Sequence, residues 1–315
     1  MRKILIALSI AGLVSTGQAQ KKTDNAEVNW GPELNEKIDG DFVNIVDDND
    51  HGIFQLVKFK KELHLQKMDM NMKVLYHKPL ELEIDKKEYR LEKIHVLNDR
   101  ILVFTSFYDK KQDQNNLYVK IYDESNFSPK GRMEKIGRIT AGKQNNSGAF
   151  YAYVSPDQSK VLVRIVQPRE KDVTKPMTVK VFDTEMQELW SKDIRLPEDH
   201  EVERFRMDDD GSVMVLTIKY AEKQERRERK RANKATYDYH LLVYHKDAEQ
   251  PEDHKIAVGD KFLQDPHFVG GEGGRHHLRR PLRQQGLLHG ARGVLPAPGP
   301  QDQGDRTREL QGILR

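Results

Sequence analysis

The 315-residue chain contains no cysteine, so disulfides, thiolate metal ligands and cysteine nucleophiles are excluded. Long apolar runs are also missing, which excludes a membrane protein with several spans. Only 13 prolines and 21 glycines interrupt the chain, and 11 Phe with 11 Tyr are too many for a disordered tail. The length suits one large domain or two ordinary ones.

The N-terminus has the pattern of a secretory signal peptide. Arg2 and Lys3 precede an apolar run from Ile4 to Val14, and small residues follow up to Ala19. The run is too short for a membrane anchor, and polar residues follow it at once. We expect a signal peptide over residues 1–19 that is cleaved after Ala19, and a mature chain in the periplasm or outside the cell, with no transmembrane span.

The last segment, residues 271–315, differs in composition from the rest. It has no aromatic residue and no Lys, and its eight Arg face four acids. The whole chain has a net charge of +3, so the residues before this tail are slightly negative. The basic character therefore predicts no specific binding of nucleic acid by the folded part.

Two interpretations of this tail remain open. One is a disordered basic segment. The other is a reading-frame slip near Gly271–Gly274, because a reading shifted by one base permits alternating apolar and polar residues with aromatics and Lys. In either case we expect residues 271–315 to be non-native, disordered or irregular.

Between residues 40 and 270, short apolar strands alternate with polar turns, a pattern typical of an antiparallel all-β chain. One unit recurs: a polar turn, a strand, a loop, a second strand that ends in an acid, and a return strand. The first of these strands begins near Ile53, Ile101, Val161 and Val213, and the second ends at Asp123, Asp183 and Asp247. A period of about 50–60 residues with four strands predicts β-propeller-like blades, about four and incomplete, followed by the irregular tail.

The turn and strand at residues 147–166, SGAFYAYVSPDQSKVLVRIV, resemble the repeats of bacterial exported β-propellers of the TolB-like or WD40-like kind. Gln158 stands where such repeats usually have Gly. The other turns keep only the Asp, Asn and Gly chemistry. The resemblance implies a propeller over about residues 40–270 that serves mostly as a binding scaffold, and it implies no catalytic residues.

No motif of catalytic grade occurs, and we predict no catalytic, cofactor or metal residues. The chain has no H-E-x-x-H metal pair, no G-x-S-x-G nucleophile elbow and no phosphate-binding Gly loop. His240 and His245 are expected on opposite faces of a strand. The acidic turns at residues 47–50 and 208–210 fit ordinary turn chemistry better than calcium loops, because neither has the full ligand spacing.

A basic segment at residues 221–235 separates two apolar strands. Its composition favours a helix, and seven cations outweigh three acids. It is interpreted either as a solvated insertion held by charge pairs or as an arm that binds an acidic partner. The candidate partner-binding residues are Arg226, Arg227, Arg229, Lys230 and Arg231.

The sequence therefore predicts a signal peptide at 1–19, a linker at 20–39, a propeller-like repeat domain at 40–270 and the tail at 271–315. The leading functional hypothesis is an exported, non-enzymatic scaffold that binds a protein or peptide, with a protein or an acidic polymer as partner of the 221–235 arm. The alternative is an exported glycan- or peptide-directed hydrolase or lyase with a site at the propeller channel mouth. Converging acids or His would favour the enzyme.

Overall fold

The structure is a computed structural model. It describes residues 40–97, 99–168, 177–196, 199–232 and 234–256 with their side chains. Of a few further strands, at 21–23, 26–28, 257, 267–270, 276–284, 287–294 and 310–311, it describes the backbone alone. The predicted signal peptide and its cleavage point after Ala19 lie outside the described residues.

Four antiparallel sheets account for most of the described chain, and in each the strands follow one another in sequence order. Sheet 1 comprises β3 (Asp41–Asn49), β4 (Gly52–Phe59), β5 (Glu62–Met68) and β6 (Val74–Pro79). Sheet 2 comprises β9 (Arg90–Leu97), β10 (Arg100–Asp109), β11 (Gln114–Asp123) and β12 (Glu134–Thr140). Sheet 3 comprises β13 (Ala149–Val154), β14 (Lys160–Val166), β15 (Met177–Asp183) and β16 (Glu188–Ile194). Sheet 4 comprises β17 (His200–Met207), β18 (Val213–Tyr220), β19 (Tyr237–Tyr244) and β20 (Glu252–Ala257).

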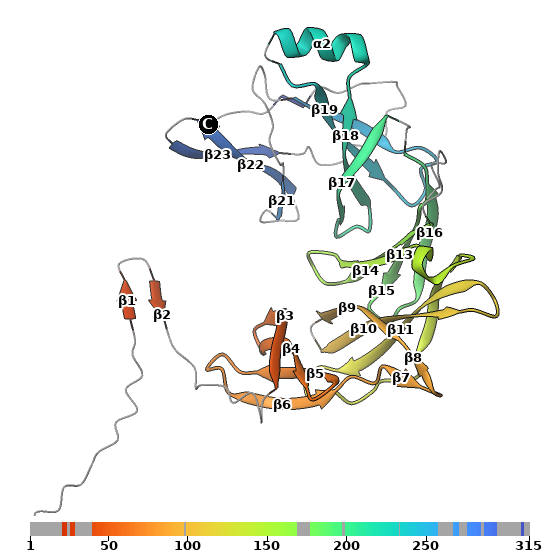
Figure 1. Cartoon of the computed structure of the whole chain (residues 1–315). Coiled ribbons are helices and arrows are strands. Elements are labelled where there is room, and N and C mark those ends of the chain that lie inside the picture. The colour runs from red at the N-terminus through yellow and green to blue at the C-terminus, as the bar shows by residue number, and fades with distance from the viewer. Residues whose placement is uncertain are drawn as a thin grey trace, which may run out of the picture. The chain divides into compact units, whose positions relative to one another are not determined.

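Successive four-stranded antiparallel sheets confirm the all-β, propeller-like fold class (Figure 1). The chain divides into two compact units, residues 1–81 and 82–315. Sheet 1 belongs to the first unit, and sheets 2, 3 and 4 belong to the second. A small hairpin, β7 (Glu83–Ile84) with β8 (Lys87–Glu88), precedes sheet 2.

The sequence period is confirmed by the second strand of each sheet. The apolar strands expected to begin near Ile53, Ile101, Val161 and Val213 are β4, β10, β14 and β18. Each is a central strand with a neighbour on both sides, and each consists mainly of buried apolar residues. This double burial explains why these strands are nearly continuous apolar runs that stand out in the sequence.

The second strand of the predicted repeat is the third strand of each sheet, and the acids at its end are turn residues. Asp123 and Asp183 close β11 and β15 as expected, and Asp69, which was not predicted, follows β5 in the same way; each side chain accepts the backbone N–H two residues further on at 2.8–2.9 Å. The expectation for the fourth repeat was wrong: β19 ends at Tyr244, and His245, not Asp247, takes the aligned place. The sequence did not distinguish the strand end from the loop because the apolar run and the acid are separated by only two residues.

An apolar residue in the left-handed backbone region completes three of these turns. The backbone φ is +63° at Met72, +56° at Phe127 and +62° at Met186. Phe127 and Met186 are buried, and Phe127 stacks on Tyr122 with ring centroids 4.2 Å apart. Burial of the side chain therefore offsets a backbone conformation that L residues rarely adopt.

The turns between the first and second strands also follow one design. Gln158 in the β13–β14 turn has a φ of +57°, and Gly211 in the β17–β18 turn has a φ of +88°. The N–H groups of both close the turn, to the carbonyls of Ser155 and Asp208. Gln158 thus does occupy the position that favours glycine, as the sequence pattern indicated.

Apolar residues on facing sheet surfaces form the core of the second unit. One cluster joins sheets 2 and 3 and includes Phe104, Leu117, Phe150 and Val163. Another joins sheets 3 and 4 and includes Leu162 and Val179 from sheet 3, with Val213, Val215 and Leu242 from sheet 4. Within this unit, each sheet thus buries a face against the next one, as in a propeller.

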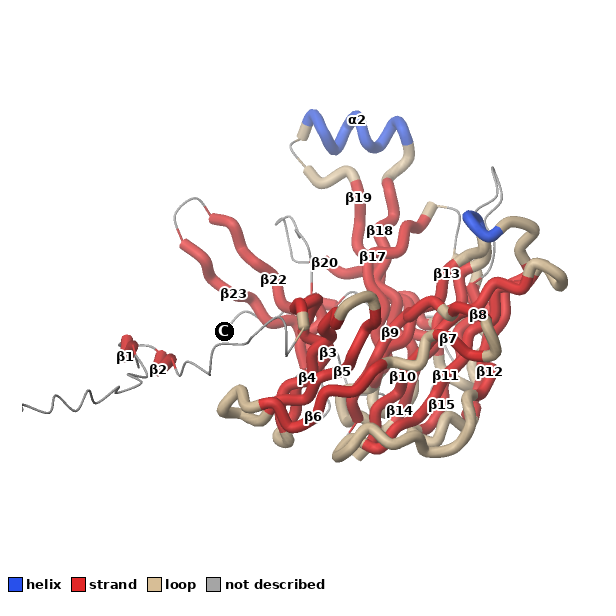
Figure 2. Tube along the Cα trace, turned by 60° about the horizontal axis from the view of Figure 1, so that its bottom comes forward, coloured by secondary structure: helices blue, strands red, loops and turns tan. Residues whose placement is uncertain are grey.

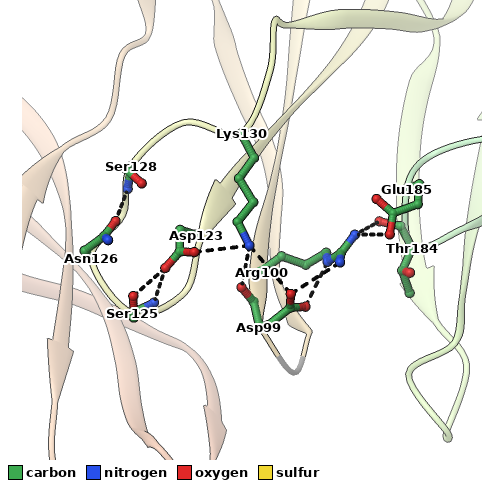
Figure 3. Close-up of polar contacts among 9 residues, drawn as sticks. All are labelled: Asp99, Arg100, Asp123, Ser125, Asn126, Ser128, Lys130, Thr184 and Glu185. Atoms are coloured by element: carbon green, nitrogen blue, oxygen red, sulfur yellow. Dashed lines mark hydrogen bonds and ion pairs between the residues drawn. The ribbon is translucent and has the colours of Figure 1, made fainter.

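A polar clasp reinforces the junction of sheets 2 and 3 (Figure 3). Arg100, the first residue of β10, reaches across to the β15–β16 turn, where it donates to the carbonyl of Thr184 at 3.2 Å and pairs with Glu185 at 2.6 Å. It also pairs with its neighbour Asp99 at 2.9 Å. The Arg100 side chain is only 16% exposed, so the clasp is partly shielded from solvent.

The neighbouring β11–β12 turn is held by Asp123 and Lys130 (Figure 3). The Asp123 carboxylate accepts hydrogen bonds from the Ser125 hydroxyl and backbone N–H, and it pairs with Lys130 at 3.1 Å. These hydrogen bonds, that of Ser125 first, lower the pKa of Asp123 to about 2. The Asp123 carboxylate therefore stays ionised well into the acidic pH range.

The two ends of the chain contribute short strands. In the predicted linker, β1 (Lys21–Thr23) pairs with β2 (Ala26–Val28). β21 (His267–Gly270) pairs with β22 (His276–Gln284), which pairs with β23 (Leu287–Val294), and β24 (Leu310–Gln311) pairs with β20 in parallel. Strands thus occur within 271–315, and the rest of the tail lies outside the described residues, so its non-native origin stays a prediction. In the described part of the chain, no helix has the length and apolarity to cross a bilayer.

Candidate functional site at the basic helix

The connection between β18 and β19 is much longer than its equivalent in sheet 2. In sheet 2 the equivalent connection runs only from Asp109 to Gln114, whereas in sheet 4 it runs from Tyr220 to Tyr237. It holds the helix α2 (Lys223–Arg231), which confirms the helix expected within 221–235. Figures 1 and 2 show α2 beyond the ends of β18 and β19, away from the sheet.

Charge, rather than apolar packing, shapes α2. None of its residues is buried, and an isolated helix of this length is marginal in water. Glu225 lies in the first turn and Arg229, Lys230 and Arg231 in the last, the order that the helix dipole favours. The Glu225–Arg229 pair, four residues apart with Nε to Oε1 at 2.8 Å, adds a further local contact.

Arg229 fastens the helix to the sheet. Its Nη2 and Nη1 donate to Oδ2 and Oδ1 of Asp238 at 3.0 and 3.2 Å, a bidentate pair with the second residue of β19. Lys255 of β20 lies 3.3 Å from the same carboxylate. Burial would raise the pKa of Asp238, but the hydrogen bond from Arg229 and the charge of Lys255 outweigh it and hold this pKa below its usual value.

The other four predicted site residues remain at the surface. Arg226, Arg227, Lys230 and Arg231 are exposed. None of their side chains forms a hydrogen bond or an ion pair with another described residue. Arg229 thus joins the helix to Asp238, while these four cations lie at the exposed surface of the helix.

Sheet 4 contains a group of polar residues that the sequence did not reveal. His200, at the start of β17, is 2% exposed at its side chain, and its Nδ1 lies 3.0 Å from Oγ1 of Thr217. The Thr217 hydroxyl donates to the carbonyl of His240, so its oxygen accepts the proton of the His200 Nδ1–H. The two imidazole rings have centroids 5.0 Å apart, and His240 Nδ1 lies 2.7 Å from Asp253.

Burial, and then the nearby His240, lower the pKa of His200. His200 is therefore neutral at neutral pH. The strand register places Thr217 directly across from His240, but the register spans the α2 insertion and could not be read from the sequence. His245 lies elsewhere, with its Nδ1 2.7 Å from the Ser212 hydroxyl.

Each acid of this polar group is matched by a base. Asp199 pairs with Lys219 at 3.1 Å, and Asp253 pairs with His240. Asp238, as described, is matched by Arg229 and Lys255. Two carboxylates free to act as acid and base, as glycoside hydrolysis requires, are not found in this group. Of this group, Asp238 is the member that contacts α2, through Arg229.

The acidic turns use their side chains to close the turn. Asp210 accepts from the Ser212 N–H at 2.7 Å and from its hydroxyl at 2.8 Å. In the other turn, Asn49 accepts from the His51 N–H at 2.8 Å. Among the described residues, no group of three or more His, Asp or Glu side chains is arranged to hold a metal ion.

No family model matches the chain, and no curated protein matches it either. Solved structures are similar at low identity. They include the α-L-arabinofuranosidase Arb93A of Fusarium graminearum (10% identity, 76% of this chain and 74% of that chain, TM-score 0.43) and the α-L-arabinanase of Penicillium chrysogenum (10%, 82% and 79%, 0.42). The β-propeller domain of the Trilobed protease from Pyrococcus furiosus is another (12%, 70% and 58%, 0.36). All three TM-scores are below 0.5, so the propeller-like assignment rests on the sheets themselves.

Proposed function

We propose that this protein is an exported, non-enzymatic scaffold that binds an acidic protein partner through the helix α2. One observation carries the proposal: α2 has no buried residue, is fastened by Arg229 to Asp238, and leaves four cations exposed. Ordering a helix costs conformational entropy, and α2 does not offset this cost by burying apolar side chains. Its retention as a rigid, charged projection is explained by a partner that it meets.

The charges favour an acidic partner and a salt-sensitive association. Exposed cations act over a Debye length of about 8 Å at physiological salt, and they increase the rate of association with an oppositely charged surface. The signal-peptide pattern at residues 1–19 supports an encounter outside the cytoplasm.

The proposal is tested with poly-glutamate as the probe, immobilised and titrated with the mature chain at low and high salt. We expect the quadruple variant R226Q/R227Q/K230Q/R231Q to bind about 30-fold more weakly, taking about 0.5 kcal/mol for each exposed charge. The free energy of unfolding should stay the same, because these side chains hold nothing in place. Circular dichroism and urea denaturation verify the second expectation.

Two matched controls sharpen this test. Lys110 and Lys111 are exposed in the equivalent connection of sheet 2, so K110Q/K111Q should change binding less than twofold while R226Q/R227Q lowers it severalfold. Arg229→Gln, in contrast, should lower stability by about 1–2 kcal/mol, because it breaks a bidentate pair. Equal losses for the two double variants would contradict the proposal, and stronger binding of heparin than of poly-glutamate would indicate a sulfated polymer instead.

A hydrolase or lyase remains the second candidate, and the group around His200, His240 and Asp253 is the described feature that comes nearest to it. Its carboxylates are matched by bases, and His200 is buried. If the protein released product from arabinan or from a peptide library, and His240→Gln abolished that release, the scaffold assignment would be wrong.

A further inference from the structure

Arg164 lies in the interface between sheets 3 and 4, on the central strand β14. Its direct neighbours across the sheet are Tyr151 on β13 and Val179 on β15. Leu162, two residues before it on the same face, and Val179 are fully buried against sheet 4. Arg164 itself is half-buried, so its side chain emerges from an apolar contact.

Two aromatic rings enclose the guanidinium. The Cζ atom of Arg164 lies 4.2 Å from the ring centroid of Tyr151 and 4.4 Å from that of Phe205 on β17. Cation–π attraction of about 1 kcal/mol for each ring holds the group in place. Both rings lie in contact distance of the guanidinium, whose N–H donors remain for an acceptor.

The described residues offer these donors no acceptor. Among the described residues, Arg164 makes no hydrogen bond and no ion pair, and its Nε is buried without a partner. Two further partly buried arginines are paired with acids: Arg100 pairs with Asp99 and Glu185, and Arg229 pairs with Glu225 and Asp238. A partly buried cation without an acceptor is costly to fold.

We infer that Arg164, with Tyr151 and Phe205, binds a carboxylate group of a ligand at the junction of sheets 3 and 4. A guanidinium edge matches the two oxygens of a carboxylate in one plane. A carboxylate keeps both of its oxygens in the plane of the guanidinium, whereas a tetrahedral phosphate directs oxygens out of that plane. Tyr151 is 44% exposed and offers a ring surface beside the bound group.

The inference is independent of the basic helix. α2 presents exposed cations to a macromolecule, whereas Arg164 offers one enclosed guanidinium to a single carboxylate. The variant R226Q/R227Q/K230Q/R231Q should therefore keep the carboxylate site unchanged, and this variant is included in the test.

Titration of the ¹⁵N-labelled full chain with sodium acetate, at constant ionic strength with sodium chloride, tests the site. The Nε–Hε resonance of Arg164, assigned by its absence in Arg164→Lys, should shift in a saturable manner. Inorganic phosphate at the same ionic strength should bind at least about fivefold more weakly, because its tetrahedral shape does not match the planar guanidinium. The absence of a saturable shift with acetate, or equal binding of phosphate, would overturn the assignment.

Variants separate the site from general effects, with acetate-induced thermal stabilisation as the common measurement. Arg164→Lys keeps the charge but loses the planar fork, and its affinity for acetate should fall about tenfold. Tyr151→Ala removes one exposed wall without touching the core and should weaken binding severalfold. Arg138→Lys, at an exposed position on β12, is the matched control and should bind as the original chain does. Unchanged acetate binding in both Arg164→Lys and Tyr151→Ala would refute the carboxylate site.

Discussion

The two interfaces of the second unit differ in what they bury. Between sheets 2 and 3 the facing surfaces are apolar, and the charged clasp of Arg100 lies at the rim with its acceptors satisfied. Between sheets 3 and 4 an apolar cluster of similar kind continues into Arg164, Thr217 and His200. Thr217 lies on the same face of β18 as Val213 and Val215, which pack on sheet 3.

The difference between these interfaces lies in the polar groups that one of them contains. An interface that only joins two sheets is most stable when it is apolar and closely packed. Polar groups inside an interface cost desolvation unless they are paired. Sheets 3 and 4 bear that cost at Arg164, whose Nε is buried without a partner among the described residues, whereas His200 is hydrogen-bonded to Thr217.

Removal of a large side chain from the apolar interface should have the largest effect. Phe104 is 1% exposed in the cluster of sheets 2 and 3, so Phe104→Ala should lower the free energy of unfolding by about 3–5 kcal/mol. Phe205→Ala, in the other interface, removes the same ring from a partly exposed place and should cost about 1–2 kcal/mol. Urea denaturation measures both, and similar losses would show that the two interfaces are packed alike.

Arg100 and Arg164, a partly buried arginine at each interface, sharpen the comparison further. Arg100→Met breaks pairs with Asp99 and Glu185, whose carboxylates are more than half exposed, and should cost about 1 kcal/mol. Arg164→Met keeps the apolar stem and loses both the cation–π contacts and an unpaired charge, so these effects should offset and the stability should change by less than about 1 kcal/mol. Thermal and urea unfolding at the same salt concentration compare them. A larger loss for Arg164→Met would mean that the rings alone satisfy the cation.

The repeating fold could be predicted from the sequence because its central strands are buried on both sides. Val161 and Val213 begin such runs, and the turns before them carry Asp and Ser residues that close local hydrogen bonds. The strand end after Tyr244 was misplaced because His245 replaces the Asp of the other repeats. Where another residue replaces the turn acid, the sequence alone does not mark the end of the strand.

The site could be predicted only in part. The charge of residues 221–235 indicated an exposed helix, but the sequence could not separate Arg229, which binds Asp238, from the four exposed cations around it. That contact depends on where β19 begins. Arg164 and His200 were missed for a related reason: each acts through residues of another strand, and the pairing across β13, β17 and β18 becomes known only with the register.

Acidification should lower the free energy of unfolding through His200, in the interface between sheets 3 and 4. The buried imidazole of His200 has a pKa below that of an exposed histidine, because burial disfavours its charged form. Between the lower folded pKa and about 6.5 the unfolded chain binds more protons, so stability should fall as the pH drops below about 6.5. Urea midpoints at pH 7.5 and 5.5 measure this loss. In His200→Gln the loss should be smaller; an identical pH profile would show that other groups cause it.

The smallest effect is expected from a single oxygen atom in the same interface. Tyr244 is 5% exposed, and its hydroxyl is buried with no hydrogen-bond partner among the described residues. Burial raises its pKa to about 12. Above pH 10 the unfolded chain loses this proton first, so the contribution of Tyr244 to stability is lost as the pH rises from about 10 to 12. Tyr244→Phe should leave stability at pH 7 unchanged or raise it by up to about 1 kcal/mol, since it removes an unpaired polar group. It should also reduce the alkaline loss, as measured by urea midpoints at pH 7 and 10.5. A decrease at pH 7 would show that the hydroxyl is satisfied by a group beyond the described residues, and this part of the interface between sheets 3 and 4 would then be as well paired as the clasp of Arg100.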